Sequence, residues 1–322
     1  MGPYFIISLE SLLSDDADLD HAITCVPGME TILRRRDLPS FCRAKQLTDP
    51  GLEIVRDETL RSAGATGIIL NTFEDLEGPI LSHVRAHFPT VYTIGPLHAH
   101  LKSRLNDSSE STHSSSSLWK EDRSCMKWLH AQHPKSVLYV SFGSFAVVTR
   151  SELLEFWHGL VNSQTRFLWV IRPDLVNGTS EVGQIPEELL QATRERGFLV
   201  EWAPQQEILA HPAVGGFLTH SGWNSTLESV FAGVPMICWS FFADQQVNSR
   251  FVEQVWRNGL DMKDRCERGT VEKMVRELMH GNVELRKSAA KMADLARKCV
   301  SRGGSSYTNM EKLIEAIRAM RL

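Results

Sequence analysis

The chain has 322 residues, and at about 150 residues for each domain this length predicts two domains. Hydrophobic residues make up 42% of the chain, which is typical of a folded globular protein and excludes a disordered one. With 35 Lys and Arg against 39 Asp and Glu the net charge is −4, so no overall positive field attracts nucleic acid or an anionic membrane surface.

No apolar run approaches the roughly 20 residues that a membrane-spanning helix needs. The opening segment has a short apolar run without a basic stretch before it, and it turns acidic at once, unlike a secretory signal. The six cysteines form no C-x-x-C pair and no zinc-binding spacing. We therefore expect a cytoplasmic protein with reduced thiols, no membrane span and no metal site.

Two short apolar segments flank a helical pattern in the first hundred residues. Residues 67–72 and 91–97 read as strands, and apolar side chains recur at helical spacing between residues 73 and 88. The order strand, helix, strand is that of a β-α-β unit in a parallel sheet. Residues 1–97 therefore predict a partial domain with only two or three strands.

A polar, Ser-rich stretch at 98–118 has no periodicity that could bury a face, and it predicts an exposed linker. After it, short β-branched runs alternate with helices, which predicts an open, doubly wound parallel sheet. The expected strands are 136–144, 167–172, 197–202, 214–220 and 234–239, and the expected helices are 150–162, 186–194, 205–210 and 223–232.

The C-terminal third reads as helical. Apolar residues recur at helical spacing in 272–279, 283–299 and 306–318, and Gly303-Gly304 separates the last two segments. We expect 119–322 to form the second domain, with its C-terminal helices as candidates for packing against the first.

The loops that follow the strands carry the candidate chemistry, because ligands of open α/β sheets bind at the carboxyl ends of the strands. The segment from His220 to Ser225 joins a strand to a helix, so its backbone N–H groups and the helix dipole favour an anion such as a diphosphate. Gly143 permits close approach of the neighbouring loop, and Ser144 adds a hydroxyl donor. An alternative for Ser225-Thr226-Leu227-Glu228 is a capping box, which is compatible with phosphate binding.

Other side chains in these loops suit a nucleoside and a sugar. Glu228 lies about one turn into the helix, where its carboxylate can accept hydrogen bonds from a ribose diol. Trp202 offers a flat face to a base, although a lone Trp also suits a core. Asp244 beside Gln245 suits sugar hydroxyls, although Asp244 also suits a helix N-cap. The residues together predict a site for a nucleotide diphosphate sugar.

Other ligand and reaction classes are disfavoured by missing motifs. The sequence contains no G-x-G-x-x-G after a first strand, no G-x-x-x-x-G-K-[ST] and no G-x-S-x-G. This argues against hydride transfer, P-loop hydrolysis and a serine hydrolase.

The 44 residues from Trp202 to Gln245 closely resemble the signature box of the plant secondary-product UDP-glycosyltransferases, members of glycosyltransferase family 1 with the GT-B fold. The strings NTFEDLE, YTIGPL, LYVSFGS and GGSSYTN are similar to the same family, so the resemblance covers essentially the whole chain. It implies an α/β fold with two Rossmann-like doubly wound domains, the N-terminal one incomplete. Within the family, the segment from Pro27 to Phe41 resembles the branch that glucosylates terpenoid, iridoid and cyanohydrin acceptors.

The resemblance implies an activity as well as a fold. The expected reaction is transfer of glucose from UDP-glucose, with inversion at the anomeric carbon, to a small hydroxylated or carboxylated plant metabolite such as a terpenoid, an iridoid or a phenolic. UDP-glucose is then a co-substrate, no cofactor is expected, and the protein is expected to be a monomer.

For the donor, the resemblance implies that Trp202 stacks on uracil, that the Ala203 backbone bonds the uracil edge, and that Gln205 and Glu228 hold the ribose. The residues implied to contact the phosphates are Ser144, His220, Asn224 and Ser225.

For the sugar, the resemblance implies that the Trp223 backbone approaches it and that Asp244 and Gln245 bind its hydroxyls. Gln245 rather than His is the family's pattern for glucose over galactose.

The catalytic base of the family is a His oriented by an Asp, and the resemblance places both upstream of Met1. No catalytic residue is therefore predicted within the sequence. His21, with Asp16, Asp18 and Asp20 nearby, is an alternative base, but a solvated acidic loop is the favoured interpretation of this run. The rival to an enzyme is a UDP-sugar-binding chain without turnover.

Overall fold

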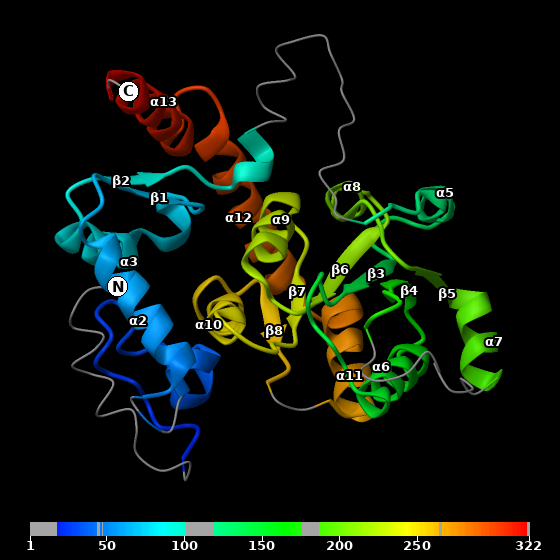
Figure 1. The fold of residues 1–322 in the computed structure, drawn as a ribbon. Coiled ribbons are helices and arrows are strands. Elements are labelled where there is room, and N and C mark those ends of the chain that lie inside the picture. The colour runs from blue at the N-terminus through cyan, green and yellow to red at the C-terminus, as the bar shows by residue number, and fades with distance from the viewer. Residues whose placement is uncertain are drawn as a thin grey trace. The chain divides into compact units, whose positions relative to one another are not determined.

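The computed structural model describes residues 18–43, 46, 48–100, 119–175, 187–263 and 266–320. Within this part the chain forms two compact units (Figure 1). The first unit comprises the described residues of Met1–Thr112 with Phe242–Arg250 and Met292–Leu322, and the second comprises those of His113–Phe241 with Phe251–Lys291. The block 119–322 that we expected as one domain is thus divided between the two units.

The second unit is built on a six-stranded sheet in which every neighbouring pair is parallel. Its strand order is β5 (Gly197–Val200), β4 (Arg166–Val170), β3 (Val137–Ser141), β6 (Val214–Thr219), β7 (Met236–Cys238) and β8 (Gly259–Asp261). The central strands β3 and β6 are buried along their whole length, because helices cover both faces, and their sequences are accordingly near-continuous apolar runs.

The order of the strands reverses between β3 and β6. From β3 the chain continues outward through β4 to β5, then returns to pair β6 with the other side of β3. In open parallel sheets the crevice at such a switch point, beyond the carboxyl ends of the strands, is where ligands bind. The fold therefore directs attention to the loops that follow β3 and β6.

The helices of the second unit alternate with these strands as the sequence predicts. They are α5 (Ser124–His130), α6 (Arg150–Asn162), α7 (Glu187–Arg196), α8 (Gln205–Leu209), α9 (Trp223–Ala232) and α11 (Arg268–Arg276), with π-helical turns η3 (Phe251–Val255) and η4 (Glu277–Gly281). The start of α6 is fixed by a capping box, in which Thr149 Oγ1 accepts from the Glu152 N–H at 3.2 Å and Glu152 accepts from the Thr149 N–H at 2.8 Å.

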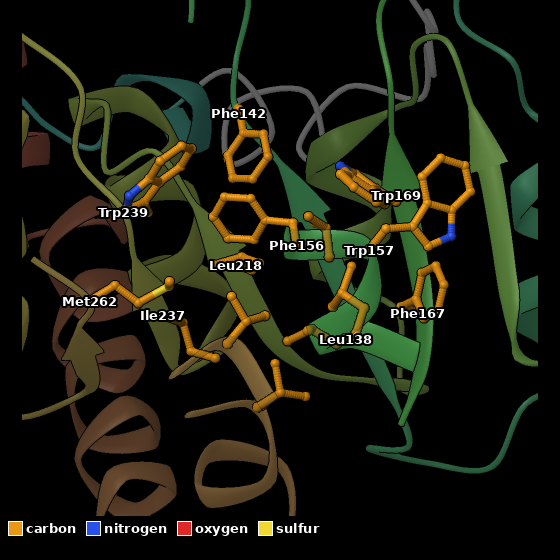
Figure 2. Close-up of a cluster of buried hydrophobic side chains, with 14 of the residues drawn as sticks. Leu138, Phe142, Phe156, Trp157, Phe167, Trp169, Leu218, Ile237, Trp239 and Met262 are labelled. Atoms are coloured by element: carbon orange, nitrogen blue, oxygen red, sulfur yellow. The ribbon is translucent and has the colours of Figure 1, made fainter. Parts of the chain in front are cut away.

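Aromatic side chains dominate the core of the second unit (Figure 2). Phe156 lies edge-on to Trp239 with ring centroids 4.5 Å apart, and Phe142 packs 5.0 Å from Phe156. The buried indole of Trp157 donates to Thr193 Oγ1 at 2.8 Å, which satisfies its N–H away from water. This packing fixes the base of the loop that begins at Phe142.

The first unit contains a parallel pair of strands, β1 (Ile68–Leu70) and β2 (Val91–Thr93). Its helices are α2 (Pro50–Ser62), α3 (Glu74–His87), α10 (Gln245–Arg250), α13 (Ser305–Ala319), the part of α12 (Val283–Val300) from Met292 onward, and the 3-10 turns η1 (Arg35–Asp37) and η2 (Ser40–Arg43). Asn309 of α13 donates to the Thr93 oxygens at 2.8 and 3.2 Å, and Cys299 contacts the Gly95 oxygen. The C-terminal helices therefore pack on the elements of the first unit.

Helices α2 and α5 and strand β8 were not predicted. Helix α2 has a recognisable start, because Asp49 accepts from the N–H groups of Gly51 and Leu52 and Pro50 occupies the first helical position. Helix α5 and strand β8 have only 7 and 3 residues, too few for a periodic pattern.

The Ser-rich linker expected at 98–118 lies outside the described residues from 101 onward. Its first residues, 98–100, are helical, and Ala99 and His100 are buried rather than exposed. No helix among the described residues is long and apolar enough to cross a membrane.

Candidate functional site

The imidazole of His220 lies between two glycines at the carboxyl end of the second unit's sheet. A Cβ atom added to Gly143 would lie 2.5 Å from the ring, and one added to Gly222 would lie 2.4 Å from it. Gly143 also has a φ of 72°, in the left-handed region that favours glycine. The loops after β3 and β6 therefore meet at His220, and they meet there because both glycines lack a side chain.

Arg172, which follows β4, holds the loop after β3 in place. Its guanidinium donates to the backbone oxygen of Gly143 and, at 2.8 Å, to that of Ala146, and its Nε donates to Asp174 at 2.9 Å. The side chain is buried, so these hydrogen bonds satisfy a charge that burial would otherwise penalise. Ser144, the residue expected to contact phosphate, lies inside the loop that Arg172 holds.

Burial changes the charge state of His220. Removal from water, assisted by the positive charge of Arg172, lowers the pKa of the imidazole to about 4. The ring is therefore neutral at pH 7 and can donate or accept a hydrogen bond there. A bound anion beside it would raise this pKa, because an opposite charge favours the protonated form.

Helix α9 begins at Trp223, with Gly222 as its N-cap and no capping side chain. The capping-box alternative is wrong, because Ser225 is already the third residue of the helix and its Oγ accepts from Gln205 Nε2 at 2.9 Å. The N-terminus of a helix has a partial positive charge and unpaired N–H donors, so the N-terminus of α9 suits an anion. The Trp223 ring lies 6.2 Å from that of Trp256, and Asn224 is exposed beside it.

Gln205, Ser225 and Glu228, three of the residues expected in the donor site, form one hydrogen-bonded network. Gln205 Nε2 donates to Glu228 Oε2 at 2.7 Å as well as to Ser225, and Gln206 Nε2 donates to Glu228 Oε1 at 3.1 Å. Tyr139 donates its hydroxyl to Gln205 Oε1 at 3.2 Å. The network fixes the Glu228 carboxylate, an acceptor of the kind that a ribose diol requires.

Sequence reasoning missed Tyr139, Gln206 and Arg172. Tyr139 is buried and stacks on Phe217, so its position in an apolar strand reads as core. Arg172 ends an apolar run, and a single cation there carries no distinctive spacing. Gln206 adjoins Gln205, and only the observed helix geometry shows that both amides reach Glu228.

Trp202 and Ala203 precede α8. The Trp202 backbone oxygen accepts from the Asp122 N–H at 2.9 Å, and its ring lies 6.3 Å from that of Trp119 at an interplanar angle of 32°. Trp202 is half-buried and Ala203 is buried. Trp119, at the end of the polar stretch, offers no sequence signal that would assign it to the site.

Asp244 and Gln245 belong to the first unit with helix α10. Asp244 is exposed, and its carboxylate accepts from Asn248 Nδ2 at 3.1 Å. Gln245 is buried, and its Oε1 accepts from the Phe242 N–H at 3.2 Å. The other nine residues expected in the site belong to the second unit.

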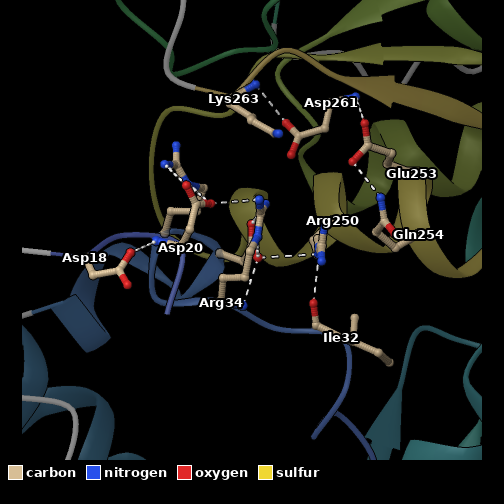
Figure 3. A network of polar contacts seen from close by, with 11 residues as sticks. Asp18, Asp20, Ile32, Arg34, Arg250, Glu253, Gln254, Asp261 and Lys263 are labelled. Carbon is tan, nitrogen blue, oxygen red and sulfur yellow. Dashed lines mark hydrogen bonds and ion pairs between the residues drawn. The ribbon is translucent and has the colours of Figure 1, made fainter. Parts of the chain in front are cut away.

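His21 is exposed. The neighbouring Asp20 carboxylate accepts from Arg34 at 3.0 Å and from Arg36 at 2.9 Å, while Asp18 accepts from the Asp20 N–H (Figure 3). The described residues of this run, Asp18 to Ala22, are exposed, and Asp20 forms ion pairs at the surface. Asp16 lies outside the described residues.

Residues 114–290, just over half of the chain, match the family described as UDP-glucoronosyl and UDP-glucosyl transferase. The chain is 59% identical over 308 residues to 7-deoxyloganetic acid glucosyltransferase of Catharanthus roseus, covering 94% of this chain and 63% of that protein. It is 49% identical to myricetin 3-O-rhamnoside 1,2-glucosyltransferase UGT709G2 of Crocosmia x crocosmiiflora, covering 99% of this chain and 66% of the relative. The chain thus spans somewhat less than two thirds of the length of these relatives.

Solved structures share the fold over nearly the whole chain. Os79 from O. sativa in complex with UDP superposes with a TM-score of 0.80 at 29% identity, covering 97% of this chain and 70% of that one. Phytolacca americana UGT2 complexed with UDP-2fluoro-glucose and pterostilbene gives a TM-score of 0.78 at 30% identity, covering 97% and 68%. These likenesses confirm the expected GT-B-type α/β fold. Because the family match covers more than half of its residues, the chain belongs to the UDP-glucoronosyl and UDP-glucosyl transferase family.

Proposed function

We propose that this chain acts in the transfer of glucose from UDP-glucose, with inversion at the anomeric carbon, to a small hydroxylated or carboxylated plant metabolite. The observation that carries the proposal is the Gln205–Glu228 network beside the N-terminus of α9, a helix that has no capping side chain. Helix α9 then supplies two groups at the switch point of the sheet. The Glu228 carboxylate can accept hydrogen bonds from a ribose diol, and the N–H groups at the helix N-terminus can donate to a diphosphate.

The proposed roles follow the chemistry of each side chain. Trp202 and the Ala203 backbone take the uracil, and the fixed Glu228 carboxylate, with Gln205, takes the ribose. The groups proposed for the diphosphate are the α9 N-terminus, Ser144, His220, Asn224 and Ser225. As the bond to the anomeric carbon breaks, negative charge grows on the departing UDP, and the backbone donors of α9 stabilise it.

The glucosyl group itself is assigned to the Trp223 backbone, Asp244 and Gln245. A carboxylate beside a carboxamide supplies acceptors and donors for neighbouring hydroxyl groups. Asp244 is exposed, and its carboxylate has accepting capacity beyond its bond to Asn248.

Relatives support the class of acceptor. The names of several of them specify iridoids, among them 7-deoxyloganetic acid at 59% identity and 7-deoxyloganetin at 46% identity. We therefore propose an iridoid or related terpenoid acceptor first and a phenolic second. No residue of this chain is assigned as the base that removes the acceptor proton, and the alternative function is UDP-sugar binding without turnover.

We also propose that the chain works as a monomer in the cytoplasm. All six cysteines are free thiols, which accords with a reducing compartment. Light scattering of the purified chain and fractionation of plant cells test the two parts of this proposal.

The function is tested by incubating the full chain with UDP-glucose and a panel of iridoid, terpenoid and phenolic acceptors, with glucoside followed by mass spectrometry. Glucoside formation that requires both substrates supports transfer. Saturable UDP-glucose binding without any glucoside would support the binding-only alternative. Absence of binding to UDP and UDP-glucose would contradict both.

A further inference from the structure

Residue Ala243 of the first unit, which directly precedes Asp244, has an unusual backbone conformation. Its φ of 58° lies in the left-handed region, which costs a residue with a side chain about 1 kcal/mol. Ser40 holds this conformation with two hydrogen bonds, because its N–H donates to the Ala243 oxygen at 3.1 Å and its Oγ accepts from the Ala243 N–H at 2.9 Å. Ser40, which is distant in sequence, therefore holds both the N–H and the backbone oxygen of Ala243 by hydrogen bonds.

The other end of α10 is anchored to the same segment of chain (Figure 3). Arg250 Nε donates to the Ile32 oxygen at 2.7 Å and lies 3.4 Å from Asp37 Oδ2. Asp37 is only 3% exposed and also accepts from Arg34 Nε and Nη2, each at 2.8 Å. The segment from Ile32 to Ser40 thus contacts the chain at Ala243, two residues before α10, and at Arg250, the last residue of the helix.

Helix α10 has only 6 residues and continues directly into η3. The hydrogen bonds to Ala243 and from Arg250 hold the chain just before the helix and at its last residue. The direction of the Asp244 side chain depends on the backbone of Ala243, since a return of φ to negative values would rotate the following peptide unit and displace the Asp244 carboxylate.

We propose that Ser40 is a positioning residue for the donor sugar, which acts by holding Ala243 and thereby the Asp244 carboxylate that is assigned to the glucosyl hydroxyls. The inference rests on the proposed function. It also gives the segment from Pro27 to Phe41 a physical role in donor binding, beyond the acceptor class with which its sequence is associated.

The test compares binding of UDP with binding of UDP-glucose by calorimetry on the full chain. Ser40→Ala removes the Oγ acceptor. We expect this variant to lower the affinity for UDP-glucose by about three- to tenfold, the range for one lost hydrogen bond, and to change the affinity for UDP by less than about twofold. Ser40→Thr keeps the hydroxyl and is expected to bind both ligands as the wild type does. Ser62→Ala is the matched control, because it removes a hydroxyl that bonds the Thr59 oxygen in α2 of the same unit.

A second variant separates positioning from a general loss of folding. Glycine adopts a positive φ without penalty, so Ala243→Gly in the Ser40→Ala background should recover part of the UDP-glucose affinity. Equal weakening of UDP and UDP-glucose by Ser40→Ala, or no weakening of either, would overturn the inference. A further loss in the double variant would overturn it as well. Failure of the wild type to bind UDP would instead contradict the proposed function on which the inference rests.

Discussion

Gln205 Nε2 donates to Glu228 Oε2 at 2.7 Å, which joins the first residue of α8 to the second turn of α9. Loss of the carboxylate removes the acceptor of the Gln206 amide, leaves the Gln205 amide with Ser225 Oγ, and removes the group proposed for the ribose. We expect Glu228→Ala to weaken UDP binding by about 1 to 3 kcal/mol, the range for leaving a buried polar group unpaired. Calorimetric titration measures this change.

Glu272→Ala is the control for that variant, because Glu272 is a carboxylate of α11 whose ion pair with Arg276 involves no residue of the site. It should bind UDP as the wild type does. Identical affinities for the wild type and Glu228→Ala would remove Glu228 from the site.

Stability should depend on the protonation of His220. The pKa of this residue in the folded chain is about 4, below the ordinary value of 6.5, so the unfolded chain binds a proton first as the pH falls. Stability is therefore lost between pH 6.5 and pH 4, by up to about 3 kcal/mol for a shift of this size. Urea denaturation of the wild type and His220→Gln across this range should show a smaller acid loss in the variant. Parallel curves for the two proteins would show that His220 does not contribute.

The two glycines beside His220 should tolerate no side chain. Gly143→Ala and Gly222→Ala would each place a Cβ within 2.5 Å of the imidazole, so the ring or the loop must move. We expect both to weaken UDP binding, Gly143→Ala more strongly because its φ of 72° adds backbone strain of about 1 kcal/mol.

Gly269→Ala serves as the matched substitution, since a Cβ there meets no atom within 4 Å. It should leave UDP affinity unchanged. Normal UDP binding by Gly143→Ala would show that the contact between the β3 and β6 loops is not needed for the site.

UDP affinity should not require a divalent cation. Among the described residues no three His, Cys, Asp or Glu side chains gather as metal ligands, and the proposed diphosphate contacts are backbone N–H groups and neutral side chains. Titration of UDP in the presence and absence of a chelator checks this. A large loss of affinity on chelation would contradict the role assigned to α9.

The strands of the second unit were predictable because buried parallel strands read as short apolar runs, and β3, β4 and β6 have that pattern. Strand β8 was not predictable, since its three residues are too few to show an apolar pattern. The start of α9 at Trp223 was predicted, and only the capping-box alternative at Ser225 was wrong, because Gly222 is the N-cap and has no side-chain hydrogen bond. The partners of the site, such as Arg172 and Tyr139, became visible only when the fold brought distant strands together.

The assignment of 242–250 to the first unit could not be predicted either. The segment directly follows the strand β7, and sequence order alone associates it with the second unit. The contacts of Ser40 with Ala243 and of Asp37 with Arg250 join residues about 200 positions apart, and no local pattern signals such pairs.

The most direct test of the donor site is titration of the full wild-type chain with UDP, followed by titration with uridine. The diphosphate should strengthen binding, because the N-terminus of α9 favours an anion. We therefore predict saturable binding of one UDP per chain, displaced by UDP-glucose and markedly tighter than that of uridine. Uridine binding as tight as that of UDP, or no saturable UDP binding, would contradict the account.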